Sequence, residues 1–85
     1  MSKAYYDALL KCAARYDDIL RLYEPSSEVR DFIDEFIDGC INEMPLNKLN
    51  RWLGYIQGVL IERGYTTVQA ERDWTRPLFR PLDFG

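Results

Sequence analysis

The sequence contains no histidine, and this absence narrows the chemistry open to the protein. Histidine is the commonest general base and the commonest metal ligand in proteins. Cys12 and Cys40 therefore have no imidazole to activate them as nucleophiles. The sequence also has no phosphate-binding loop, no zinc-ligand spacing and no nucleophile elbow. We expect a protein that is not an enzyme and that uses no catalytic residue, cofactor or metal.

Long hydrophobic runs are also missing. No stretch approaches the roughly 18–20 apolar residues of a membrane-spanning helix, and residues 1–7 lack the continuous apolar segment of a secretory signal. Two cysteines are few for a disulfide scaffold, and both fall at apolar helical positions, so we expect free thiols in a core. The sequence thus predicts a cytoplasmic protein that does not interact with membranes.

What is present is a high apolar content with helical spacing. The chain has 85 residues, of which 47% are hydrophobic, and this suits one domain over residues 1–85. Each of two domains would be too short to bury a core. Apolar side chains recur three and four residues apart, as in amphipathic helices, and Pro77 is expected to stop the last of these. The third helix is the most apolar and is expected to be central. We predict an all-α fold, a compact bundle of three to four helices at about residues 3–23, 27–42, 45–63 and 67–75, with an extended tail over residues 76–85.

Small polar residues and glycines predict where the helices begin and end. Either serine of the turn at residues 25–27 is able to cap the second helix. Gly64 stands where a helix-ending glycine is expected after the third helix, and Thr66 and Gln69 have the spacing of a capping box for the fourth. Gly39 lowers the helix propensity of its segment, so we expect the last turn of the second helix to fray or bend.

Charge is distributed unevenly along the chain. The formal net charge is −3, but residues 1–43 hold ten acids and five bases, whereas residues 44–85 hold four acids and six bases. Four acids share one side of the second helix: Glu28, Asp31, Glu35 and Asp38. Like charges at these spacings repel each other by about 0.2–0.5 kcal/mol per pair. The row is either a solvated helix face or a surface that binds a basic protein region which normally holds nucleic acid; the chain lacks the basic surface needed to bind nucleic acid itself.

Arginines and aromatic residues gather near the C-terminus. The candidate partner contacts there are Arg72, Trp74, Arg76, Phe79 and Arg80. Arginine together with aromatic side chains is typical of binding hot spots and also stacks on nucleotide bases. The alternative is that this segment is strapped across the chain's own core.

Two glycines four residues apart interrupt the third helix. Gly54 and Gly58 each cost about 1 kcal/mol relative to alanine in a helix interior. Together with Trp52 they predict a shallow groove where a partner, a ligand or another helix approaches closely. The alternative is tight packing against the first or second helix of the same chain.

Residues 51–60 (RWLGYIQGVL) and 71–79 (ERDWTRPLF) resemble the C-terminal part of small proteins encoded by tailed bacteriophages and prophages. The resemblance covers about residues 46–80. It implies a phage accessory protein acting in the cytoplasm of a bacterial host, where such small acidic proteins often bind and block host machinery, including CRISPR and other defence systems. It assigns no residue a role.

The residues and the resemblance together predict an anti-CRISPR-like inhibitor that occludes a basic surface of a host protein complex with its acidic second helix. An alternative from another class is an oligomeric nucleotide-binding sponge, which sequesters a signalling nucleotide with Trp52, Gly54, Gly58 and the arginines. A third is a helical, self-assembling phage structural protein. A homodimer or a higher homo-oligomer is compatible with each of them.

Overall fold

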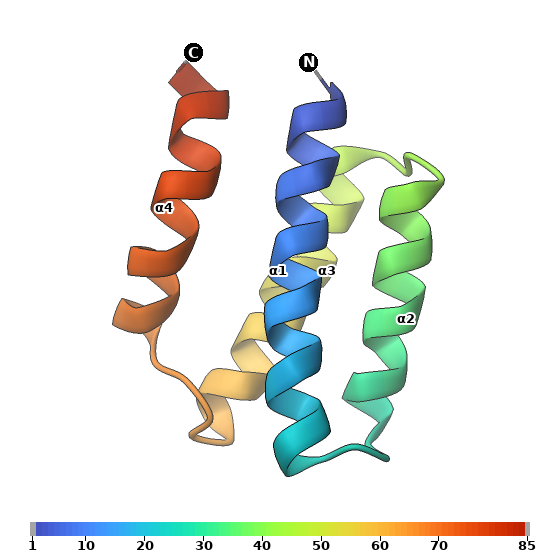
Figure 1. Cartoon of the computed structure of the whole chain (residues 1–85), viewed down its shortest axis with the longest axis vertical. Coiled ribbons are helices and arrows are strands. Elements are labelled where there is room, and N and C mark those ends of the chain that lie inside the picture. Colours follow the sequence, from blue (N-terminus) through green and yellow to red (C-terminus); the bar gives the residue numbers. More distant parts are fainter. Residues whose placement is uncertain (1, 85) are drawn as a thin grey trace.

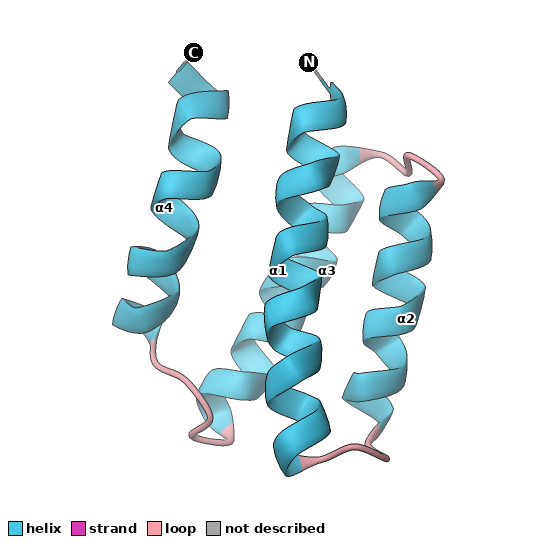
Figure 2. Ribbon diagram, in the orientation of Figure 1, coloured by secondary structure: helices cyan, strands magenta, loops and turns pink. Residues whose placement is uncertain are grey.

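The computed structural model describes residues 2–84, and it confirms the all-α class. Four helices follow one another in the chain: α1 (Ser2–Tyr23), α2 (Glu28–Ile41), α3 (Leu46–Glu62) and α4 (Val68–Phe84). Figure 2 shows that only short loops join them, with no strand in the described part of the chain. None of these helices is long and apolar enough to cross a membrane.

The central helix is α1, whereas the sequence favoured α3. In Figure 1, α1 stands between α2 and α4, with α3 behind it, and α1 packs against all three other helices. The hydrophobic core is drawn from the first three helices and consists of Tyr6, Ala8, Leu9, Cys12, Ala13, Tyr16, Leu20, Val29, Ile33, Phe36, Cys40, Leu49, Leu53, Ile56 and Leu60. Both cysteines are free and buried, as predicted. The result is a three-helix body with α4 attached to one side of α1.

A close approach of side chains explains Gly39 better than fraying does. The residue is buried near the end of α2, and a Cβ placed on it would lie 2.7 Å from Met44 Sδ and 2.9 Å from Leu49 Cδ2. The chain then reverses through Glu43, whose φ is 55°, and the Met44 amide donates to the Gly39 carbonyl at 2.9 Å. A larger residue here would have to displace the ends of the Met44 and Leu49 side chains, because α2 and the start of α3 come together at this point.

The turn after α3 is the glycine-ended type that the sequence predicts. Gly64 has a φ of 79°, its amide donates to the Ile61 carbonyl at 3.1 Å, and the Tyr65 amide donates to the Leu60 carbonyl at 2.9 Å. This pair of hydrogen bonds is the Schellman pattern, in which glycine adopts a left-handed conformation without steric cost. At the start of α2, Ser27 is the serine that caps the helix, accepting from the Arg30 amide at 3.2 Å.

The prediction of an extended tail over residues 76–85 is wrong for the described residues, because α4 continues to Phe84 through Pro77 and Pro81. Each proline lacks the amide hydrogen that a helix interior uses. Both prolines are exposed, so the carbonyls left without a partner can be solvated, while the inner side of the helix still packs on α1. Gly85 lies outside the described residues.

The predicted capping box of Thr66 and Gln69 is wrong, because the residue that caps α4 is Thr67. Thr67 is the residue whose hydroxyl accepts from the Ala70 amide, at 3.0 Å, three residues into α4. Thr66 instead turns its hydroxyl toward Glu71. The first turn of α4 is thus capped by Thr67, and Thr66 is free to take part in a tertiary contact.

The two buried thiols give a test of the packed core. Burial raises the pKa of Cys12 to about 12 and that of Cys40 to about 11, so neither forms the reactive thiolate near pH 8. We expect a thiol reagent at pH 8 to label the native protein only as fast as it unfolds, and to label the urea-unfolded protein rapidly. Fast labelling of the native Cys12→Ser or Cys40→Ser variant would show that the remaining thiol is not buried.

Candidate functional site

The acidic residues predicted on α2 line an open groove between α2 and α3. Glu28, Asp31 and Glu35 are exposed, and with Phe32 and Tyr55 they surround a hollow of about 480 Å³. We call these five residues the acidic groove. Asp38 is exposed on the same helix but does not line the groove, so the structure brings together three of the four predicted carboxylates.

Two aromatic rings line the acidic groove together with the carboxylates. Phe32 is half-buried and meets the Tyr55 ring edge to face, with centroids 5.4 Å apart and planes at 88°. On its other side Phe32 contacts Trp52, at a centroid distance of 5.2 Å. Tyr55 is 56% exposed. Flat aromatic surface beside carboxylates is suited to guanidinium or ammonium groups, which stack on rings and pair with acids.

Arginines pair with Asp17 and Asp34, but not with the acids of the groove. The Arg30 side chain reaches from α2 to Asp17 of α1, with Nε 2.6 Å from Oδ1, and it also pairs with Asp34 at 3.0 Å. Arg21 binds the second oxygen of Asp17 at 2.7 Å. By contrast, no lysine or arginine among the described side chains forms an ion pair with the groove carboxylates. The groove therefore keeps an uncompensated negative charge.

The five predicted C-terminal contacts do not form one surface. Trp74 and Phe79 are half-buried against α1, where the Arg15 guanidinium lies 5.0 Å from the Trp74 ring centroid and Phe79 lies 5.1 Å from the Tyr5 ring. The three arginines are exposed on α4: Arg72, Arg76 and Arg80. The aromatic residues thus attach α4 to α1, as in the strapping alternative, and only the arginines remain available to a partner.

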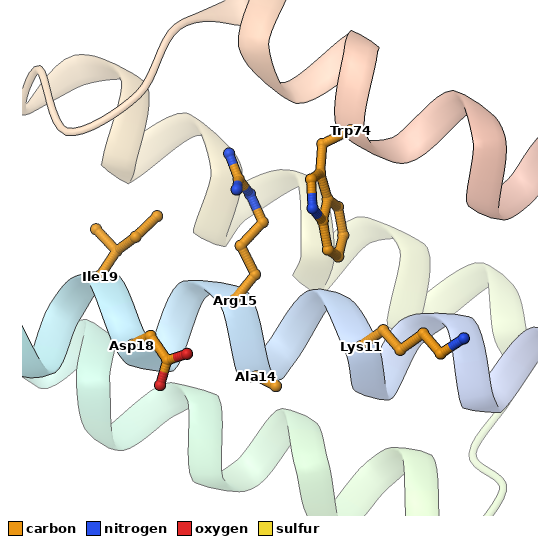
Figure 3. A pocket seen from close by; sticks show the side chains of 6 residues that line it. All are labelled: Lys11, Ala14, Arg15, Asp18, Ile19 and Trp74. Atoms are coloured by element: carbon orange, nitrogen blue, oxygen red, sulfur yellow. The ribbon is translucent and has the colours of Figure 1, made fainter.

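A second hollow, of about 530 Å³, opens between α1 and α4. Figure 3 shows its lining, with Arg15 and Trp74 side by side and Lys11 and Asp18 on opposite flanks. The Arg15 guanidinium is already committed, because it stacks on Trp74 and bonds Glu71. The hollow is open and carries charges of both signs, so it has weak chemical selectivity for an anion.

Glu71 is the structural residue that sequence reasoning missed. It is only 5% exposed. Tyr16 Oη donates to its Oε1 at 2.5 Å, while Arg15 Nη2 at 3.0 Å and Thr66 Oγ1 at 2.5 Å donate to its Oε2. Gln57 of α3 donates to the Tyr16 hydroxyl at 2.9 Å. One carboxylate on α4 therefore links α1, the connecting turn and, through Tyr16, α3; we call this set the Glu71 hub.

The pKa of Glu71 follows from two opposing effects. Burial alone raises the pKa, but the hydrogen bonds from Arg15, Thr66 and Tyr16 outweigh it and hold the pKa below the ordinary value of 4.5. A signal for the hub was present in the sequence, because Glu71 precedes Trp74 by three residues and Leu78 by seven. It is a lone acid on the apolar side of a helix.

Gly54 and Gly58 do not make the predicted close contact within the chain. Both are exposed, and a Cβ placed on either would have no heavy atom within 4 Å. Trp52 turns away from them, toward Phe32, with Lys48 Nζ 5.4 Å from its ring centroid. The alternative of tight packing on α1 or α2 is therefore wrong, and the two glycines present bare backbone to solvent. The predicted shallow groove for a partner or a ligand stays a prediction.

Comparisons with known proteins find no matching family, curated protein or solved structure. Within residues 2–84, no group of three or more cysteine, aspartate or glutamate side chains is arranged to hold a metal ion.

The Glu71 hub predicts a specific loss of stability. Replacing Glu71 by Gln keeps the shape but removes the charge opposite Arg15, so we expect the free energy of unfolding to fall by about 2 kcal/mol, the scale of a hydrogen bond to a charged group. Urea unfolding followed by circular dichroism measures this change. Asp73→Asn on the exposed side of the same helix is the matched control, with a change of less than about 0.5 kcal/mol expected. Equal losses in both variants would contradict the hub.

The hub also predicts how stability depends on pH. The pKa of Glu71 is lowered in the folded state, so its contribution is complete above the unfolded pKa near 4.5 and is lost as the pH falls through the folded pKa. We expect the difference in unfolding free energy between the wild type and Glu71→Gln to be constant from pH 7 to about pH 5 and to shrink below about pH 4.5. A difference that grows on acidification would mean that the carboxylate is not stabilised by its partners.

Proposed function

We propose that this protein is a non-enzymatic binding protein that seats its acidic groove on a basic surface of a host protein complex. The observation that carries the proposal is the set of three unpaired, exposed carboxylates that line one hollow with two aromatic side chains: Glu28, Asp31 and Glu35 with Phe32 and Tyr55. A solvated helix face needs no such aromatic lining. The groove is open enough to accept arginine or lysine side chains from a partner surface.

The energetics favour a cationic protein surface over other occupants. A guanidinium over an aromatic ring gains about 0.5–2 kcal/mol, and a hydrogen bond to a carboxylate adds about 1.5–3 kcal/mol. Phe32 is fixed by its contacts with Trp52 and Tyr55, so little conformational freedom is lost when a partner side chain binds. Nucleic acid is repelled, because residues 1–43 carry twice as many acids as bases.

The proposed target is a nucleic-acid-binding complex, and the mode of inhibition is occlusion. A basic channel that holds phosphates presents rows of arginine and lysine, and carboxylates three and four residues apart on α2 complement such a row. The resemblance to phage and prophage proteins implies that the protein acts in the bacterial cytoplasm. It also implies that the target is a defence system such as CRISPR. Occupying the channel would then exclude the nucleic acid by competition.

The nucleotide-sponge alternative has less geometric support. Its proposed residues are dispersed, since Trp52 faces Phe32 and Gly54 faces solvent, while the arginines project from α4, which packs on α1. Neither the acidic groove nor the hollow between α1 and α4 is lined by Trp52, Gly54 or the arginines of α4.

Charge reversal in the groove tests the proposal. The double variant Asp31→Lys, Glu35→Lys places like charges against a basic partner, which costs several kcal/mol, so we expect binding to weaken by at least about 100-fold. The measurement is capture of a complex from bacterial lysate on the immobilised protein, followed by its release with added DNA or RNA. Release by nucleic acid is expected because both compete for one surface.

The matched control is Asp7→Lys, Glu62→Lys, which changes the net charge equally at exposed sites outside the groove. We expect the control to capture the complex as the wild type does. Capture that survives groove reversal, or a captured complex that still binds labelled nucleic acid at full affinity, would refute occlusion by this groove.

A further inference from the structure

The outer side of α4 carries a row of arginines that the fold does not use. Arg72, Arg76 and Arg80 are exposed at four-residue spacing, so they project from one side of the helix along about 12 Å, at roughly 1.5 Å per residue. No carboxylate among the described side chains forms an ion pair with these arginines. We call these three residues the arginine face.

The acidic groove is the complement of the arginine face in charge, length and chemistry. Its carboxylates, from Glu28 to Glu35, extend along about 10 Å of α2 at the same rise per residue, so two helices lying side by side bring acids and arginines into register. Guanidinium groups stack on aromatic rings and bind carboxylates in a fork. The groove offers both partners, since Phe32 and Tyr55 line the same hollow as the acids.

One molecule cannot bring its own two surfaces together. Figure 1 shows α2 and α4 on opposite sides of α1, and the rigid packing of α1 against both helices keeps them apart. We infer that copies of this protein associate head to tail, with the arginine face of one copy seated in the acidic groove of the next. Because the two surfaces differ, each contact leaves one of each free, and association continues as a ring or a chain.

This inference does not rest on the proposed function, although it uses the same groove. Self-association needs only the purified chain, whereas the proposed function needs a host complex. A second copy in the groove competes with any other basic partner, so dilution and salt would control how much groove is free. The two proposals therefore fail in different experiments.

Sedimentation velocity over a range of protein concentrations tests the head-to-tail contact. At low salt, near 0.02 M, we expect the wild type to form species larger than dimers as concentration rises, and to return to monomer near 0.5 M salt, where charges are screened within about 5 Å. The variants Asp31→Lys, Glu35→Lys and Arg72→Glu, Arg76→Glu are each expected to weaken association by at least about tenfold.

Mixing the two reversed variants restores complementarity. The reversed groove of the first faces the reversed α4 of the second, and the unreversed surfaces also match, so an equimolar mixture is expected to assemble although each variant alone does not. Lys3→Glu, Lys11→Glu on exposed α1 positions is the control for the change in net charge of the Arg72→Glu, Arg76→Glu variant, and it is expected to assemble like the wild type. Circular dichroism verifies that every variant is folded.

Three outcomes would overturn the inference. The first is a wild type that stays monomeric at low salt at every concentration. The second is assembly that stops at a dimer, which indicates a symmetric contact in place of a head-to-tail one. The third is a mixture of the reversed variants that fails to assemble although both are folded.

Discussion

The attachment of α4 depends on one buried carboxylate. Glu71 is the one charged residue buried among the described part of the chain, and both of its oxygens accept hydrogen bonds, from Tyr16, Arg15 and Thr66. A charge taken out of water costs several kcal/mol unless it is paired. A shift of α4 on α1 would break the hydrogen bonds from Tyr16 and Arg15, so the Glu71 hub holds in place a helix whose large apolar residues are only half-buried or exposed.

The position of α4 on α1 determines which of its side chains are exposed to solvent. With Glu71 against α1, Trp74 and Phe79 face the same way and the arginines face outward. On the other side of α1, Arg30 neutralises Asp17 and Asp34 and leaves the carboxylates of the acidic groove free. Figure 1 shows α2 and α4 on opposite sides of α1, so α1 separates the carboxylates of α2 from the arginine face of α4.

The first three helices could be predicted because their apolar spacing and their boundaries agree. The second half of α4 could not, because the local rule that proline ends a helix competes with packing on α1, and that packing is a tertiary effect. The role of each glycine could not be predicted for the same reason. Gly39 is crowded by Met44, whereas Gly54 has open space around it. Helical spacing placed Glu28, Asp31 and Glu35 on one side of α2, but the aromatic wall from Tyr55 comes from another helix and has no signature in the local sequence.

The prolines of α4 have a consequence for the surface opposite them. Helices in proteins owe most of their stability to tertiary packing, and without the amide hydrogens of Pro77 and Pro81 α4 has two fewer main-chain hydrogen bonds. Arg76 and Arg80 therefore project from one side of α4 only while α4 packs on α1. The arginines are evenly spaced in the sequence, but they line up on one side of a helix only after the first three helices have folded. The basic surface of α4 therefore forms together with the fold.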